Sequence, residues 1–195
     1  MKKLLVFLSL SLLTIVSFSQ KEETEAKELK PALLVLDVQK SFINWMEQEH
    51  LDTRYAYINY AINLFRAKDL PVIRIYHTTP GQGPEEGTEE FEFVDKIQIK
   101  DSDPKVVKNY GNAFKKTDLD KVLKDKDVNT IFIVGLSGTG CVLATYFGGS
   151  DRDYATHLIK GAVISPKAEY TKVIEESQNA LSVTAVSLLL EYGLK

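Results

Sequence analysis

The chain holds one cysteine, Cys141, in the segment IFIVGLSGTGCV (131–142), where an apolar run leads into a glycine-broken turn before an expected helix. Backbone N–H groups at the start of a helix favour negative charge on sulfur, so this position suits a thiolate nucleophile. Gly135, Gly138 and Gly140 allow the main chain to fold closely around a substrate oxygen. The alternative is a packing residue, because most free cysteines are buried and inert.

A carboxylate and an imidazole follow two other apolar runs. Asp37 comes directly after the run 32–36, and His77 comes directly after the run 71–76. The carboxyl ends of parallel strands share one edge of a sheet, and ligands bind there. We therefore expect the acid, the imidazole and the thiol of Cys141 to converge on that edge.

The strands that would position these groups are short runs rich in Val, Ile and Leu, which is typical of strands buried on both faces. They are Ala32–Leu36, Pro71–Tyr76 and Thr130–Gly135, with a weaker one at Thr156–Lys160. Helical stretches separate them, and this alternation predicts an α/β fold with a mostly parallel central sheet.

The helices are predicted from apolar spacing and from capping residues. Apolar residues at positions 58, 62 and 65 recur at helical spacing, and Thr117–Asp120 resembles a capping box that opens a helix. A further helix is expected around Glu169–Gln178. The stretch Leu181–Tyr192 fits a strand followed by a short helix, with Gly193 as a stop.

The N-terminal residues predict export. Two lysines precede an apolar run that is shorter than a membrane span, and small residues flank Phe18. We interpret residues 1–19 as a cleaved signal peptide, residues 20–30 as a charged lead-in and residues 31–195 as the folded domain. We expect an exported, periplasmic protein with no membrane attachment after cleavage. An uncleaved anchor is the alternative. A single cysteine cannot form an internal disulfide, so a shielded thiol is expected.

Composition limits the classes of partner. The chain is 44% hydrophobic and 26% charged, which suits one globular domain, and its net charge of −3 lacks the basic stripe of a nucleic-acid binder. We expect a small-molecule substrate and no nucleic acid.

Three segments, in order, resemble the isochorismatase-like cysteine hydrolases, which include nicotinamidases and carbamoylsarcosine and ureidoacrylate amidohydrolases. They are LLVLDVQKSF (33–42), VVKNYGNAFKKTDL (106–119) and IVGLSGTGCVLAT (133–145). The resemblance covers roughly residues 32–165 and implies a three-layer αβα sandwich, no cofactor and a homo-oligomer.

The resemblance also implies a catalytic triad of Asp37, Lys108 and Cys141. Cys141 would attack the substrate, Asp37 would accept the thiol proton and return one to the leaving amine, and Lys108 would favour the thiolate. Water would then clear the thioester intermediate.

The resemblance implies further site residues at matching positions of this chain. Backbone N–H groups of Ser137 and Cys141 would form the oxyanion hole, with a cis peptide at Leu136–Ser137. The substrate contacts that we expect are made by Gln39, Phe42 and Tyr110, although each has a structural alternative: local hydrogen bonding for the amide and core packing for the aromatic rings.

The chain departs from the family pattern in three places. The segment after the second run carries His77 alone, without the Asp-x-His of nicotinamidases, so no metal site is expected. Gly148–Gly149 weakens the helix after Cys141. The acidic segment Glu85–Glu92 fits either a lid or, preferably, a flexible solvated loop.

The sequence therefore predicts a metal-independent cysteine hydrolase for a small amide or ureido C–N bond. The alternatives are a non-catalytic binding protein of the same fold, a redox or thiol-scavenging protein, and an isochorismatase-type ether hydrolase. The last is disfavoured because that reaction needs no cysteine.

Overall fold

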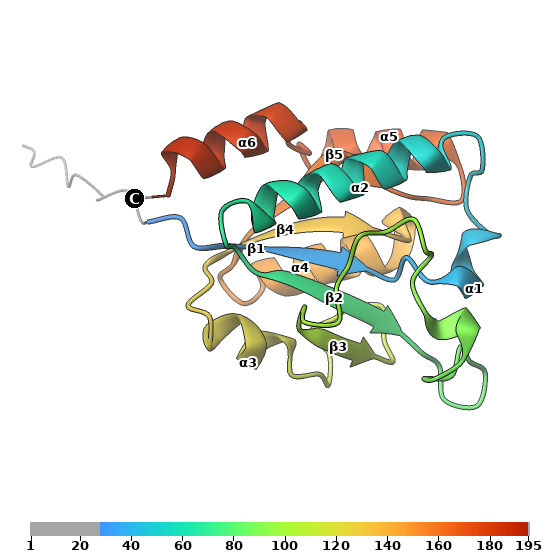
Figure 1. The fold of residues 1–195 in the computed structure, drawn as a ribbon. Coiled ribbons are helices and arrows are strands. Elements are labelled where there is room, and N and C mark those ends of the chain that lie inside the picture. The colour runs from blue at the N-terminus through green and yellow to red at the C-terminus, as the bar shows by residue number, and fades with distance from the viewer. Residues whose placement is uncertain (1–27, 195) are drawn as a thin grey trace, which may run out of the picture.

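The computed structural model describes residues 28–194, which form a parallel sheet with helices on both faces (Figure 1). The predicted signal peptide at 1–19, and the lead-in at 20–30 except for its last three residues, lie outside the described residues. Within the described part of the chain, the helices are too short or too polar to cross a membrane.

The sheet has five strands in the order β3-β2-β1-β4-β5, and every neighbouring pair is parallel. Their bounds are β1 Pro31–Leu36, β2 Val72–His77, β3 Lys105–Lys108, β4 Thr130–Gly135 and β5 Ala155–Val163. The chain builds outward from β1 in both directions, so the carboxyl ends of β1 and β4 flank the point where the topology reverses. Such a switch point leaves a crevice between the connecting segments.

The strand predictions are confirmed with small shifts. Thr130–Gly135 has the predicted bounds. His77 is the last residue of β2 and pairs with Lys108 of β3, so its backbone belongs to the sheet and not to the following loop. The weak run at 156–160 is part of a nine-residue strand.

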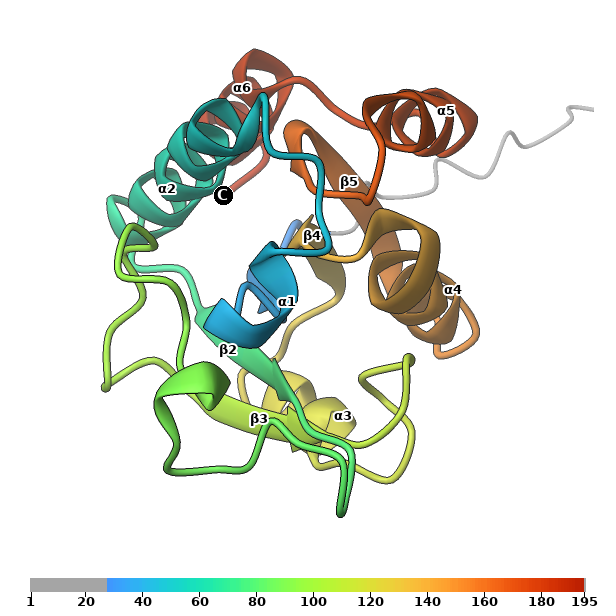
Figure 2. The same ribbon diagram turned by 90° about the vertical axis from the view of Figure 1, so that its right-hand side faces the viewer.

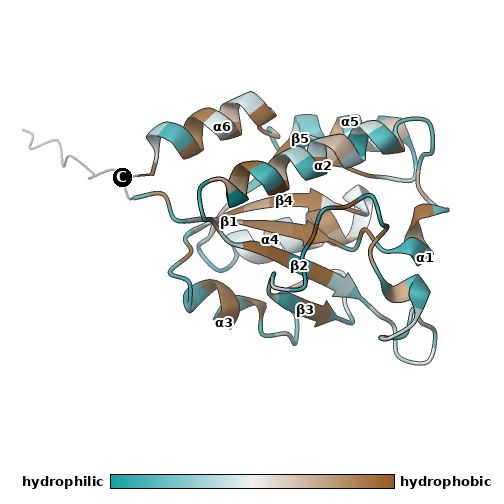
Figure 3. Ribbon diagram, viewed as in Figure 1, coloured by the Kyte–Doolittle hydropathy of each residue, from teal (hydrophilic) through white to brown (hydrophobic). Residues whose placement is uncertain are grey.

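Helices cover both faces, so the predicted three-layer αβα sandwich is confirmed (Figure 2). The helices are α1 Lys40–Ile43, α2 Leu51–Arg66, α3 Leu119–Lys124, α4 Leu143–Ser150, α5 Ala168–Ser177 and α6 Val183–Tyr192. Residues of α2 and α6 share one core cluster, whereas residues of α3, α4 and α5 share the other. The apolar strands lie between the two clusters (Figure 3).

The predicted helical spacing in α2 is confirmed by burial. Ile58, Ile62 and Phe65 are fully buried against the sheet. Burying a side chain of this size contributes about 1.5–3 kcal/mol, so this apolar stripe is enough to hold the helix on its face of the sheet.

The N-terminal ends of α3 and α6 differ from the sequence prediction. A helix begins near Thr117, but the N-cap is Asp118 without a side-chain cap, and the Thr117 hydroxyl instead accepts a 3.3 Å hydrogen bond from the Leu119 N–H. Leu181 makes only an isolated parallel bridge to Ile159, and α6 starts after Ser182, whose hydroxyl accepts from Ala185 N–H at 3.1 Å. The stretch Leu181–Tyr192 is therefore a helix from Val183 onward, without the predicted strand before it.

Gly148 and Gly149 allow α4 to pack closely against its neighbours. A Cβ on Gly148 would lie 2.3 Å from the Asn112 side chain, and one on Gly149 would lie 2.7 Å from Ile131. The eight-residue α4 is short, as expected, and the missing side chains let it approach the sheet and the loop after β3.

The acidic segment Glu85–Glu92 is solvated, as predicted, but its C-terminal end is anchored by an aromatic side chain. It includes the short 3-10 helix η1, Glu89–Phe91. Phe91 is fully buried and stacks on Tyr76 with ring centroids 4.8 Å apart, and Phe93 meets the same ring edge-on. The glutamates themselves remain exposed on this anchored backbone.

Candidate active site

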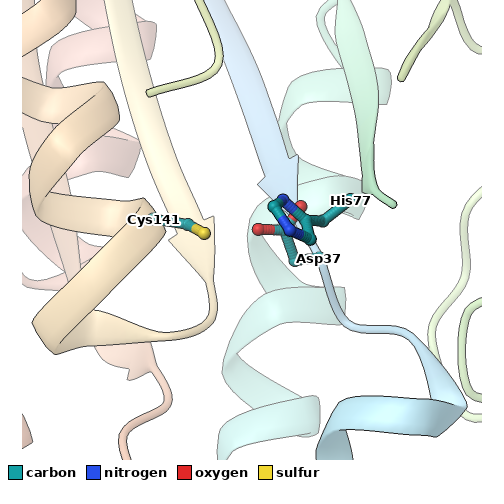
Figure 4. Close-up of side chains that lie close together, drawn as sticks. All are labelled: Asp37, His77 and Cys141. Carbon is teal, nitrogen blue, oxygen red and sulfur yellow. The ribbon is translucent and has the colours of Figure 1, made fainter. Parts of the chain in front are cut away.

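Four polar side chains meet at the carboxyl edge of the sheet. Asp37 follows β1, His77 ends β2, Lys108 ends β3 and Cys141 lies in the turn after β4. Figure 4 shows the Cys141 sulfur directed from that turn toward Asp37, with His77 beside the carboxylate. The predicted convergence of the acid, the imidazole and the thiol is confirmed.

Unusual backbone conformations place the first and last of these groups. Asp37 has a φ of 54°, a left-handed conformation that Asp and Asn tolerate better than most residues. Gly135 has a φ of 110°, and a Cβ there would lie 2.1 Å from the Leu36 carbonyl oxygen. Only glycine lets β4 end this close to β1, which brings the cysteine turn over Asp37.

Cys141 lies in a helical turn that β4 leads into. The π-helical turn η2, Gly138–Val142, precedes α4. Gly138 is packed so tightly that a Cβ would lie 2.3 Å from the Ser165 hydroxyl oxygen. The turn is therefore seated against the segment after β5, and the thiol is partly exposed on its open side.

Lys108 is the centre of the cluster. Its side chain is fully buried, and Nζ lies 2.7 Å from Asp37 Oδ2, 2.9 Å from His77 Nδ1 and 3.1 Å from Cys141 Sγ. The contacts with His77 and Cys141 have hydrogen-bond geometry, whereas the contact with Asp37 is an ion pair.

Asp37 keeps acceptor capacity despite its burial. Its contact with Lys108 is an ion pair, but neither carboxylate oxygen accepts a hydrogen bond of good geometry from any residue in the described range. Burial raises the pKa of the Asp37 carboxyl, and the Lys108 charge opposes that rise. A carboxylate with unused lone pairs beside a thiol can take the thiol proton.

The surroundings of Cys141 favour the thiol over the thiolate. Burial first, and the Asp37 charge second, raise the pKa of the thiol to about 11, although Lys108 acts in the opposite direction. The thiol is therefore protonated at neutral pH, and an attack on substrate requires a proton acceptor at hand.

His77 has a larger place in the site than a solitary histidine suggests from sequence. Burial, and then the Lys108 charge, lower the pKa of His77 to about 4, so the imidazole is neutral near pH 7. Nδ1 accepts from Lys108, which leaves the proton on Nε2, 3.3 Å from the Thr79 hydroxyl oxygen. The signal in the sequence that pointed to the site was the position of His77 at the end of an apolar run.

A cavity of about 240 Å³ opens over the cluster. Its lining is formed by Asp37, Phe42, Trp45, Met46, His77, Leu136, Ser137 and Cys141. Phe42 is thus placed where a substrate would contact it, and Trp45 stands at the edge with 75% of its surface exposed. A larger hollow of about 580 Å³ lies beside Lys40 and Tyr55, but Asp37 and Cys141 do not line it.

Two residues expected to touch substrate are placed elsewhere. Gln39 is fully buried and uses its amide on the main chain of His77: Oε1 accepts from the N–H at 2.7 Å, and Nε2 donates to the carbonyl at 3.0 Å. Tyr110 lies under Lys115, whose Nζ is 4.1 Å from the ring centroid, and does not line the cavity. For Gln39 the structure thus shows the alternative of hydrogen bonding to the main chain, whereas Tyr110 is only partly buried and is not a core residue.

The predicted oxyanion-hole segment has the expected backbone form. Leu136–Ser137 is a cis peptide, and Ser137 lines the cavity beside Cys141. The Ser137 carbonyl accepts from the N–H groups of Gly140 and Val142, at 2.9 and 3.1 Å, which closes the turn around the thiol.

Potential metal ligands also meet here. Ligand atoms of Asp37, His77 and Cys141 lie within 4.8 Å of one another. Lys108 Nζ, however, contacts all three side chains. A metal ion among them would have to displace a buried ammonium, so the donor set favours a metal-free arrangement.

Known proteins share this sequence pattern and fold. Residues 31–184 match the family profile of the Isochorismatase domain. The uncharacterized isochorismatase family protein YrdC of Bacillus subtilis is 30% identical over 139 residues, which are 69% of this chain and 74% of YrdC.

Solved structures agree on the fold. A cysteine hydrolase from Pseudomonas syringae pv. phaseolicola superposes with a TM-score of 0.73 at 21% identity, covering 84% of this chain and 93% of that one. N-carbamoylsarcosine amidase from Thermoplasma acidophilum gives 0.68 at 22% identity, covering 79% and 95%. With the profile match over most of the chain, these findings show that the protein belongs to the isochorismatase family and has its hydrolase fold.

Proposed function

We propose that the protein hydrolyses a C–N bond of a small amide or ureido compound through a thioester on Cys141. The observation that carries this proposal is the buried Asp37 carboxylate, which keeps free lone pairs beside a thiol at the floor of a cavity. The names of two structural neighbours, a cysteine hydrolase and an amidase, support the same chemistry.

The proposed reaction begins with proton transfer from Cys141 Sγ to Asp37 as sulfur attacks the substrate carbonyl carbon. Asp37 then gives this proton to the leaving nitrogen, the C–N bond breaks and a thioester remains. A water molecule gives a proton to Asp37 while it attacks the thioester carbonyl. The acid product leaves, and Asp37 returns the proton to sulfur.

The electrostatics suit this proton exchange. Burial raises the pKa values of both Asp37 and Cys141, so the carboxylate is a stronger base than in water and the thiol waits protonated. Lys108 Nζ, 3.1 Å from Sγ, stabilises the negative charge that sulfur acquires during attack.

Backbone donors complete the proposal. The N–H groups of Ser137 and Cys141 would bind the oxyanion that forms on the attacked carbonyl. Removing one such donor typically slows turnover by about a hundredfold or more.

The cavity lining favours a neutral substrate with an apolar group. Phe42, Met46 and Leu136 supply apolar surface, and the described lining residues include no Arg or Lys to pair with a substrate carboxylate. An isochorismatase-type ether hydrolase stays disfavoured, because that reaction needs no cysteine whereas Cys141 lines this cavity.

We further propose an exported, periplasmic location and self-association. The lysines and apolar run at the N-terminus support export.

Exposed apolar side chains support a homo-oligomer: Tyr60 on α2 is 50% exposed, and Leu188 and Tyr192 on α6 are 53% and 75% exposed.

A panel of small amides and ureido compounds, assayed for ammonia or amine release, tests the proposal. We expect turnover in the wild type and none in Cys141→Ala, with a covalent acyl adduct detectable by mass spectrometry in the wild type only. Product formation that persists in Cys141→Ala would refute the proposal.

A non-catalytic binding protein of the same fold is the second candidate, because the cavity lined by Phe42, Met46 and Leu136 can hold a ligand whether or not Cys141 converts it. Trp45 is the only tryptophan of the chain and stands at the cavity, so its fluorescence reports binding without turnover. A ligand that changes this fluorescence while no panel compound is converted would select the binding function.

A further inference from the structure

One polar side chain at the site has no part in the reaction proposed above, although it touches the centre of the cluster. His77 Nδ1 lies 2.9 Å from Lys108 Nζ. It is the third neighbour of that nitrogen, beside Asp37 and Cys141, and the only one of the three that neither attacks nor carries the proton of the reaction.

We propose that His77 is a positioning residue, whose Nδ1 accepts a hydrogen bond from Lys108 and so holds Nζ between Asp37 and Cys141. This inference rests on the proposed function, because it assigns a role within that same site.

The geometry around Lys108 requires a third acceptor. The side chain is fully buried, so a freed N–H direction would find no bulk water. Without the imidazole acceptor, Nζ would be drawn toward the carboxylate of Asp37, its strongest partner, and the 3.1 Å contact with Cys141 Sγ would lengthen.

The imidazole is itself held in place on several sides. The Gln39 amide bonds both the N–H and the carbonyl of His77, at 2.7 and 3.0 Å. The Thr79 hydroxyl lies 3.3 Å from Nε2, and the Phe42 ring meets the imidazole edge-on with centroids 5.9 Å apart. These contacts explain why a polar side chain is buried at position 39. The Gln39 amide holds the His77 backbone, and His77 in turn holds Lys108.

The charge state of His77 is consistent with an acceptor role. The titratable side chains that it contacts or approaches are Lys108, Asp37 and Cys141. Burial and the Lys108 charge keep the ring neutral near pH 7, with its pKa lowered to about 4, so Nδ1 retains its lone pair in that range.

The test is a matched pair of variants, His77→Asn and His77→Leu. Asn Oδ1 stands where Nδ1 stood and can accept from Lys108, whereas Leu has nearly the same size and no acceptor. Both variants remove the ring equally, so an effect of lost volume would be common to them. Thermal melting of each variant confirms folding.

We expect kcat on the best panel substrate to fall by roughly 30- to 100-fold in His77→Leu and by less than about fivefold in His77→Asn. Binding of that substrate, followed by Trp45 fluorescence, should change little in either. Equal losses of kcat in both variants, weaker binding in both, or no loss in either would overturn the proposal.

Alkylation of Cys141 by iodoacetamide supplies a readout that needs no substrate. We expect a slower rate at pH 9 in His77→Leu, because a displaced ammonium no longer stabilises the thiolate, and a wild-type rate in His77→Asn. This separates the two proposals: a difference between the variants supports the positioning role even if no amide is turned over. Identical alkylation in an active enzyme refutes the positioning role alone.

Discussion

Two buried carboxylates in this protein have opposite environments. Glu175 on α5 accepts a 2.8 Å hydrogen bond from the Gly161 N–H and lies 3.5 Å from Arg54 Nη1. Asp37 has an ion pair to Lys108 but no hydrogen bond of good geometry within the described residues. Burial raises the pKa of both groups.

The difference separates a structural acid from one available for chemistry. Glu175 binds a main-chain N–H of β5 and thereby joins α5 to the sheet. Asp37 faces a cavity and a thiol, and its lone pairs remain free for a proton. Burial and a raised pKa are common to both, so unused acceptor capacity is the property that distinguishes the site.

The largest expected contrast is between Asp37→Asn and Glu175→Gln. Asn tolerates the left-handed backbone at position 37 but cannot accept the thiol proton, so turnover should fall by about a thousandfold. Gln at position 175 keeps the bond to Gly161, so turnover should stay within about twofold. Steady-state ammonia release measures both, and an active Asp37→Asn enzyme would contradict the role of this carboxylate as the base.

The next largest contrast is expected between the cationic partners of the two carboxylates, Lys108 beside Asp37 and Arg54 beside Glu175. Lys108→Met removes the charge that stabilises sulfur, and kcat should fall by about a hundredfold. Arg54→Met removes the partner of Glu175, where the Gly161 N–H remains, so kcat should be nearly unchanged. Denaturant unfolding of both variants is the control: similar losses of stability with unequal losses of kcat would confirm that the difference is chemical.

A smaller effect is expected on the alkylation rate of Cys141, which should change in opposite directions in the two site variants. Because Asp37 raises and Lys108 lowers the pKa of Cys141, alkylation at pH 8 should be about tenfold faster in Asp37→Asn and slower in Lys108→Met than in the wild type. Glu175→Gln is the matched control and should react at the wild-type rate. Mass spectrometry of iodoacetamide labelling follows the single thiol, and changes of the same sign in both site variants would disprove this electrostatic account.

The smallest expected effect is on stability at alkaline pH. The thiol pKa is about 11 in the folded protein and near 9 when unfolded, so the folded state alone retains the proton in this window. Its contribution to stability is therefore complete below pH 9 and declines as the pH rises toward 11.

Urea unfolding at pH 8 and pH 10 measures this decline. The wild type should lose roughly 1 kcal/mol more than Cys141→Ser over that interval, because serine does not titrate there. Equal losses in the two proteins would show that the thiol pKa is not raised on folding.

Much of the fold and part of the site could be predicted from local patterns. The run at 32–36 is apolar throughout and the run at 130–135 has Thr130 as its only polar side chain, so their strand character could be predicted from composition, and their parallel pairing from the alternation with helices. Asp37 could be placed at the sheet edge because it directly follows such a run, and Cys141 because it lies in the turn after one. The anchoring of the acidic segment was missed because Phe91 and Phe93 are isolated apolar residues among glutamates, and their burial depends on Tyr76, a partner from another element.

The amino-acid sequence by itself determined the alternation of elements, the family and the residue types at the sheet edge, since these depend on neighbours along the chain. Only the tertiary structure decided the electrostatic state of the site. Protonation of Cys141, neutrality of His77 and the use of Gln39 on the His77 main chain arise from burial and from distances of about 3 Å between residues that are 31 to 38 positions apart. Desolvation and Coulomb interaction act through space, so no local pattern records them.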